Sequence, residues 1–335
     1  MDLLDLFSRG FMQRALIAAA VTGLAAPAVG TYLVQRRLAL MGDGIGHVAV
    51  TGVALGLLTG IAPIWTAVVV AVLGAVAMEL IRERGHTNGD VALALLFYGG
   101  LAGGVLLTGI GGQSAARLQE FLFGSILTIS VTDMLAVLVL AVVVVLICVG
   151  LAPQLFAVAQ DQEFARVAGL RVRGYNLLIA VLAAVSVTVA MRTVGLLLVS
   201  ALMVVPVATA QQVTRSFRTT LAAAMVLGTL ASLGGLVVAA GASFQVRVAA
   251  GPTIVLLSLL GFAVTWPLGV WLRHRQRLHA PFAPSAAVVH ETAGPHTDHA
   301  HGEDCGHAAV RHGDHVDYVH DGHRHAPHGE HYDEH

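Results

Sequence analysis

The fold is decided by residues 32–60, YLVQRRLALMGDGIGHVAVTGVALGLLTG, an apolar run that carries an acid and an imidazole. Asp43 and His47 are four residues apart, so in a helix they lie one turn apart on the same face. A carboxylate and an imidazole together suit a divalent transition metal, and ionisable groups at membrane depth usually have a function. Alternatively, Asp43 caps the start of this helix and His47 bonds a neighbouring carbonyl group. The spacing alone leaves both interpretations open.

The same stretch also has a face of small residues. Its glycines recur at every fourth position, at Gly52, Gly56 and Gly60. This small-xxx-small pattern lets a second membrane helix approach closely. Thr51 lies one turn after His47 and extends the polar face. The stretch therefore predicts a membrane helix with one packing face and one ligand-bearing face.

The composition is that of a polytopic membrane protein. The chain of 335 residues is 56% hydrophobic and 12% charged, whereas soluble domains carry about 25% charged residues. The net charge of −1 hides two opposite parts. Residues 1–279 hold seventeen basic and ten acidic residues, whereas residues 280–335 hold two basic and ten acidic residues. We therefore expect a transmembrane domain over 1–279 and a separate polar tail over 280–335.

Lysine is absent, because all nineteen basic residues are arginine. A Walker-type nucleotide site needs the lysine of G-x-x-x-x-G-K-[ST], so this chain cannot hydrolyse ATP at such a site. We expect no enzymatic activity, no permanently bound cofactor and no nucleic-acid partner. Cys148 lies in an apolar run and Cys305 in the polar tail, so no disulfide framework is expected.

The hydropathy pattern predicts an all-α membrane bundle of about nine transmembrane helices, or eight if one segment does not cross. The predicted spans are 15–34, 47–60, 64–81, 91–110, 134–151, 176–191, 194–210, 221–240 and 253–272. A secretory signal peptide is the alternative for the first segment, but its length and its acidic lead-in MDLLDLF favour a retained helix. Arginines in alternate short loops place the C-terminus in the cytoplasm by the positive-inside rule.

Several polar residues near the predicted membrane ends have structural explanations. Residues 130–133 fit a capping box at the start of a span, so Asp133 is predicted to be a cap. Residues 111–129 are too polar to span and predict a short helix at the outer interface, and Pro206 predicts a kink. Four further residues are interpreted as interface caps or interhelical pairs rather than pathway residues: Glu79, Asp90, Glu120 and Arg192.

The loop between the fifth and sixth spans, APQLFAVAQDQEFARVAGLRVRGYN, has a helical pattern of its own. Phe164, Val167 and Ala168 recur at i, i+3 and i+4, and Gly169 follows in the position of a helix-ending C′ residue. Such a helix can lie flat on the cytoplasmic side with its ends joined to two membrane helices. It would either transmit a push from outside the membrane into the bundle or act as an ordinary connection.

Five separated stretches resemble one family. They are RRLALMGDGIGHVAVTGVALG, LFGSILTIS, DQEFARVAGLRV, MRTVGLLLVSALMVVPVATAQQ and AAGPTIVL, in this order. Together they look like the permease subunits of bacterial ABC importers for zinc, manganese or iron, over about residues 10–272. The resemblance implies a type II, vitamin-B12-importer-like permease fold that works as a homodimer in the bacterial plasma membrane. It also implies two cytoplasmic ATPase subunits and an extracytoplasmic metal-binding protein as partners.

The resemblance also assigns roles to particular residues. It implies a coupling helix that docks on the ATPase, around Asp161, Glu163, Ala165 and Gly169. It makes Asp43 and His47 the residues that handle the ion along the pathway. Two ligands from one protomer are too few for a closed zinc site, whereas a dimer would supply four. A permease has to release its ion, so a pathway site should not be a tight cage.

The tail holds thirteen of the seventeen histidines, interleaved with Asp, Glu and Gly. The candidate metal ligands among them are His299, His301, His307, His312, His315, His320, His323, His325, His328, His331 and His335. The absence of apolar periodicity predicts that residues 280–335 are disordered without metal. Histidine-rich tracts bind zinc, nickel, cobalt or copper better than manganese or magnesium, so zinc is favoured as both transported ion and tail ligand.

For the cytoplasmic tail we hypothesise that it collects released zinc, or reports its level and lowers transport when saturated. Histidine ligands must be neutral, so this binding should weaken below about pH 6. A neutral solubilising tail or an expression tag is the alternative, although tags are uninterrupted histidine runs.

Three other functions are compatible with parts of the sequence. A secondary zinc carrier with a His-rich sensor needs pairs of His and Asp ligands that face each other from different spans. A siderophore or cobalamin permease of the same architecture needs neither the Asp43/His47 pair nor the tail. A membrane metal sensor that transports nothing would not co-purify with an ATPase.

Overall fold

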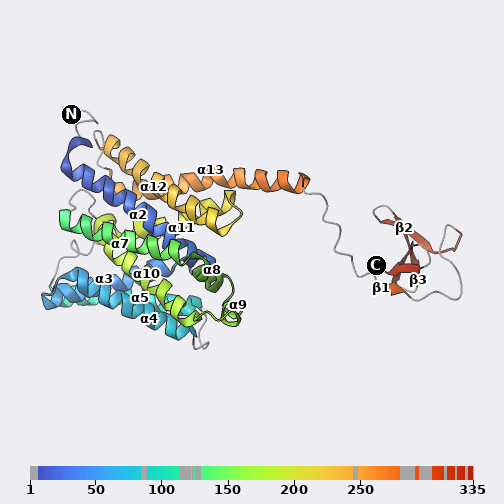
Figure 1. The fold of residues 1–335 in the computed structure, drawn as a ribbon, viewed down its shortest axis with the longest axis horizontal. Helices are drawn as coiled ribbons and strands as arrows, with labels where there is room; N and C mark the ends of the chain where they lie inside the picture. Colours follow the sequence, from blue (N-terminus) through green and yellow to red (C-terminus); the bar gives the residue numbers. More distant parts are fainter. Residues whose placement is uncertain are drawn as a thin grey trace. The chain divides into compact units, whose positions relative to one another are not determined.

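A computed structural model describes residues 7–83, 89–112, 122, 124, 130–243, 248–279, 291–293, 304–312, 315–320, 323–328 and 331–334. The chain divides into two compact units, residues 1–272 and 273–335. Helix α13 crosses this division and ends at His279. Each unit is described by itself (Figure 1).

The first unit is a bundle of long helices, as predicted. These are α2 (Gly10–Gln35), α3 (Met41–Thr59), α4 (Pro63–Glu83), α5 (Gly89–Ile110), α7 (Val131–Gly150), α10 (Val172–Val194), α11 (Leu196–Val213), α12 (Phe217–Ala242) and α13 (Ala250–His279). In the described part of the chain, eight helices are long and apolar enough to cross a membrane. A ninth span is added if α7 and the short helix α8 (Ala152–Gln160), which meet at a bend of 70°, form one span.

The helices pack in two groups that share α10. In the first group α2 packs against α7, α11 and α12, and in the second α3 packs against α4 and α5. Figure 1 shows α3, α4 and α5 side by side along one edge of the bundle. Because α10 contacts α2 as well as α3 and α4, it joins the two groups into one hydrophobic core.

The arginine-bearing helix ends lie together at one end of the bundle. Arg36, just after α2, donates a hydrogen bond to Glu79 near the end of α4, at 3.0 Å. Arg173, at the start of α10, pairs with Glu83 at the end of α4, at 3.1 Å. Gln35 of α2 donates to Gln160 at the end of α8. These contacts bring the basic segments after α2, at the end of α4 and before α10 to one end of the bundle, as the sequence leads us to expect for these three.

The second unit contains a five-stranded antiparallel sheet with strand order β1-β5-β4-β3-β2. Its strands are β1 (Glu291–Ala293), β2 (Ala308–His312), β3 (His315–His320), β4 (His323–His328) and β5 (His331–Glu334). The missing apolar periodicity led to an expectation of disorder without metal, whereas the structure places these five strands in the tail. Period-2 alternation in HVDYVH and the two-residue connections, each of one Gly with Asp or Glu, are the strand and hairpin signals that this expectation overlooked.

Some sequence predictions fall outside what the structure describes. Most of residues 111–129, including Glu120, lie outside the described residues. The side chains of Asp90, Asp133 and Arg192 do as well, although α7 begins at Val131, as the predicted cap requires. Pro206 lies inside α11.

Candidate metal pathway and coupling helix

Asp43 lies in the first turn of α3 but is not its N-cap. The N-cap is Leu40, which makes no side-chain capping bond. A carboxylate at this position is favoured by the positive end of the helix dipole. The alternative in which Asp43 serves as the cap therefore does not describe this helix.

His47 faces Asp43 across one turn of α3. The distance from His47 Nε2 to Asp43 Oδ2 is 3.8 Å, which is longer than a hydrogen bond. The side chains are 12% and 27% exposed, respectively. His47 Nδ1 is buried and has no hydrogen-bond partner among the described residues. The imidazole therefore does not bond a neighbouring carbonyl group, whereas the alternative interpretation of His47 requires such a bond.

The His47 ring is held by α5. Its centroid lies 4.3 Å from that of Phe97 in an edge-on arrangement. Gly100 allows this close approach, because a Cβ there would stand 2.6 Å from the backbone nitrogen of Val48. Thr51 donates to the Gly100 carbonyl at 2.5 Å, so it joins α3 to α5 instead of extending a free polar face.

The predicted glycine face is correct at two of its three positions. A Cβ on Gly52 would meet the backbone of Ala67, and one on Gly56 would meet Pro63, so both positions allow α4 to approach. Gly60 has no neighbour near a Cβ position. Its φ of 75° ends α3 in the left-handed conformation, which glycine adopts without strain. Gly60 is therefore a helix terminator and not a packing residue.

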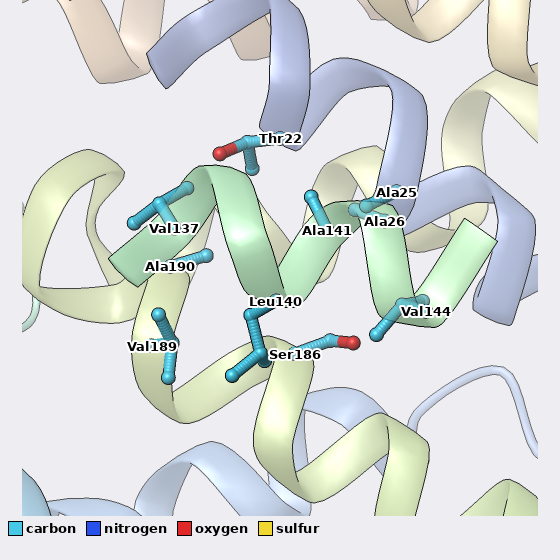
Figure 2. Close-up of a pocket in the computed structure, with 10 residues that line it drawn as sticks. All are labelled: Thr22, Ala25, Ala26, Val137, Leu140, Ala141, Val144, Ser186, Val189 and Ala190. Carbon is cyan, nitrogen blue, oxygen red and sulfur yellow. The ribbon is translucent and has the colours of Figure 1, made fainter. Parts of the chain in front are cut away.

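A small cavity lies deeper in the bundle, between α2, α7 and α10 (Figure 2). Its volume of about 20 Å³ is enough for about one water molecule. The walls are almost entirely apolar, and the only side-chain oxygens belong to Thr22 and Ser186, which Figure 2 shows on different walls. This cavity does not include Asp43 or His47, so it is not an ion site in this conformation.

The predicted coupling helix is α9 (Gln162–Val167). Asp161 is its N-cap, and one carboxylate oxygen accepts hydrogen bonds from the backbone N–H groups of Glu163 and Phe164, at 2.9 and 3.0 Å. Gly169 has a φ of 82°, and the N–H groups of Gly169 and Leu170 bond back into the last turn. This is the Schellman arrangement, so Gly169 is the predicted C′ residue.

The side chains of α9 divide into a buried anchor and an exposed apolar surface. Ala165 is buried and packs against Val158 and Val172 of the adjoining helices. Phe164 and Val167 are 66% and 88% exposed. The apolar pattern that predicts this helix therefore does not pack on the bundle but leaves two large apolar side chains uncovered.

A buried charge network was only partly anticipated. Glu79 accepts hydrogen bonds from Arg36 and, at 2.5 and 3.2 Å, from Arg82. The side chains of Arg36 and Glu79 are almost fully buried. Burial lowers the pKa of Arg36, and the charge of Glu79 opposes this shift. The structural interpretation of Glu79 is correct, but Arg36 was expected only as a cytoplasmic charge.

The tail histidines are described to different extents. His307 and His325 are described with their side chains, and His325 is buried. His299, His301 and His335 lie outside the described residues. The remaining candidates are placed by their strands only: His312, His315, His320, His323, His328 and His331. Among the side chains that are described, no group of three or more His, Cys, Asp or Glu is placed to hold a metal ion.

The bundle of membrane-length helices, the Asp43/His47 pair and α9 define the class: a multi-pass, mostly helical membrane transport subunit. The model of the ABC 3 transport family matches residues 8–267, and the chain belongs to this family. It is therefore a transport subunit and not itself an enzyme.

Named relatives and a solved structure agree with this membership. The chain is 33% identical over 267 residues to the manganese import system permease protein ScaB of Streptococcus gordonii, covering 80% of this chain and 94% of that protein. It is 27% identical to the high-affinity zinc uptake system membrane protein ZnuB of Haemophilus influenzae, covering 75% and 95%. The solved structure of PsaBC from Streptococcus pneumoniae in complex with Fab matches with a TM-score of 0.71 and 30% identity, covering 82% of this chain and 98% of that chain.

Proposed function

We propose that this chain is the membrane permease of an ATP-driven importer that moves a divalent transition-metal ion, with zinc favoured, into the cytoplasm. The observation that carries the proposal is the Asp43/His47 pair. A carboxylate and an imidazole stand 3.8 Å apart on a membrane helix, and neither is used as a helix cap. Relatives named for manganese, zinc and chelated iron transport support a metal ion as the substrate.

The pair is suited to transient binding. Two ligands of a tetrahedral zinc ion, with bonds of about 2.0–2.2 Å, stand roughly 3.4 Å apart. A small side-chain rotation would bring His47 Nε2 and Asp43 Oδ2 from 3.8 Å to that distance. Two ligands per protomer hold an ion loosely enough to release it.

The energy source would be a separate pair of cytoplasmic ATPase subunits, because this chain contains no lysine for a Walker-type site. The exposed side chains of Phe164 and Val167 on α9 offer these subunits an apolar contact, and α9 is fixed to the bundle through Ala165. The same end of the bundle carries the arginine-rich helix ends, which the positive-inside rule places in the cytoplasm. An extracytoplasmic protein would deliver the ion at the opposite end.

Zinc is favoured over manganese by ligand chemistry. An imidazole suits zinc, whereas manganese prefers oxygen ligands, and the tail adds thirteen histidines. Manganese is the second candidate, because relatives that are 33% identical to this chain are named manganese import permeases.

Uptake by vesicles that contain the permease and its ATPase would test the proposal. We expect ATP-dependent uptake of ⁶⁵Zn that unlabelled zinc competes strongly and manganese or iron competes weakly. Stronger competition by manganese would make manganese the substrate. Uptake driven by an ion gradient without ATP would instead indicate a secondary carrier. Uptake of a siderophore or cobalamin would indicate a permease for those compounds. No uptake of any of these substrates would favour a membrane metal sensor.

A further inference from the structure

An internal repeat in the tail coincides with the hairpins of its sheet. Residues 312–335 contain three consecutive eight-residue units, HGDHVDYV, HDGHRHAP and HGEHYDEH. Each unit has histidine at its first and fourth positions and Asp or His at its sixth. The first histidine of a unit ends one strand and the second begins the next strand, so each unit forms one hairpin with a two-residue connection.

The strand register places the two histidines of each unit directly opposite each other. The pairs are His312 with His315, His320 with His323, and His328 with His331. Residues opposite each other in an antiparallel pair share a face of the sheet, with Cβ atoms about 4.5–5.5 Å apart. Two imidazoles at such positions can reach one zinc ion at about 2.0–2.1 Å from each nitrogen.

The sixth position of each unit adds a third donor on the same face. It lies two residues after the second histidine, and strand residues two apart share a face at a distance of about 6.7 Å. The third donors are Asp317, His325 and Asp333. Asp317 and His325 are only 0% and 4% exposed, so in two of the units this donor is fixed within the packed sheet.

We propose that each of the three hairpins is a separate zinc site with three protein ligands. Two sites have two histidines and one aspartate, and the middle site has three histidines. Three protein ligands leave the fourth position of a tetrahedral ion open to water or another ligand. An acceptor ligand could take over the ion through this open position, which suits a store or sensor of imported zinc. The inference rests on the proposed function only for the identity of the ion.

The sheet geometry favours one ion per hairpin over one shared ion. Continuing the β3–β4 register from the pair of Tyr318 and His325 puts His315 opposite His328. Four histidines then form one row across β2, β3, β4 and β5, but a row across three strand spacings is about 14 Å wide. Bonds of about 2 Å cannot draw all four to a single ion. The middle site is on the other face, because His320 lies five residues after His315.

Cobalt(II) binding by the full-length, metal-stripped chain in detergent would test this inference. Cobalt takes the place of zinc, and its visible absorption reports tetrahedral coordination and the number of ions bound. We expect His312→Asn with His315→Asn to lose one bound cobalt ion per chain relative to the unmodified protein. Removing the histidine pairs of all three hairpins should lose three ions. The matched control is His290→Asn with His296→Asn, which removes two tail histidines outside the repeat and outside the candidate ligands and should lose none.

Two results would overturn the three separate sites. If the control loses as much cobalt as the first-hairpin variant, binding depends on histidine content and not on the hairpins. If the first-hairpin variant loses no ion, or loses all three at once, the hairpins are not independent sites. Because cobalt binding is measured without transport, failed zinc uptake in vesicles would overturn the proposed function and leave this result standing.

Discussion

At the scale of single residues, His47 is the side chain on which the proposed ion pathway depends most directly. We expect His47→Ala to lower ATP-dependent zinc uptake by about tenfold or more, because even outer-shell partners of metal ligands cost 10–100-fold in affinity or activity when removed. The side chain packs against Phe97 without bonding any carbonyl among the described residues, so its loss should leave the fold intact. Vesicle uptake measures the effect, and co-purification of the ATPase checks assembly.

A matched control for His47 is His274→Ala, which removes an imidazole near the end of α13. Its uptake should remain near that of the unmodified protein. Normal uptake by the His47 variant would remove this residue from the mechanism.

Glu79 gives a prediction about stability. Glu79→Gln leaves Arg36 buried beside a neutral partner, and breaking a buried ion pair costs about 3–5 kcal/mol. We expect a loss of this size in the free energy of unfolding, measured by reversible SDS unfolding in mixed micelles. The control Glu83→Gln breaks a pair with the exposed Arg173, which should cost at most about 1 kcal/mol. Equal losses of unfolding free energy in both variants would show that the buried pair stabilises the protein no more than the exposed pair does.

At the scale of elements, α9 is tied to the permease by one buried residue and presents two exposed ones to a partner. We expect Phe164→Ala with Val167→Ala to abolish most co-purification of the ATPase. Exposed substitutions usually change stability by less than about 0.5 kcal/mol, so the unfolding midpoint should not move. Val213→Ala, at the exposed end of α11, is the control and should keep the ATPase. Full retention of the ATPase by the double variant would contradict docking through α9.

The helices could be predicted because local sequence patterns specify them. The contacts between helices could not, because they join residues that are far apart in the sequence. Nine apolar segments and the Asp161 to Gly169 cap pattern can be read along the chain, and the structure confirms both. The burial of Arg36 depends on Glu79, which is 43 residues away, and the contact of Thr51 depends on Gly100. The strands of the tail were missed because histidine and aspartate hide a period-2 pattern that hydropathy does not detect.

At the scale of the whole molecule, the chain divides into two compact units at residue 272, so we expect the bundle to fold without the sheet. A chain ending at residue 284 should therefore insert, bind the ATPase and import zinc at the initial rate of the full-length protein. If the tail binds zinc and lowers transport, the shortened chain should continue to import after the full-length protein has slowed. The time course of ⁶⁵Zn uptake into vesicles preloaded with increasing zinc measures this difference.

The control is the full-length chain with the histidine pairs of all three hairpins replaced by asparagine, which keeps the tail but removes its proposed ligands. If this variant slows like the unmodified protein, zinc on the hairpins does not regulate transport, and if the shortened chain also slows normally, the tail has no regulatory part.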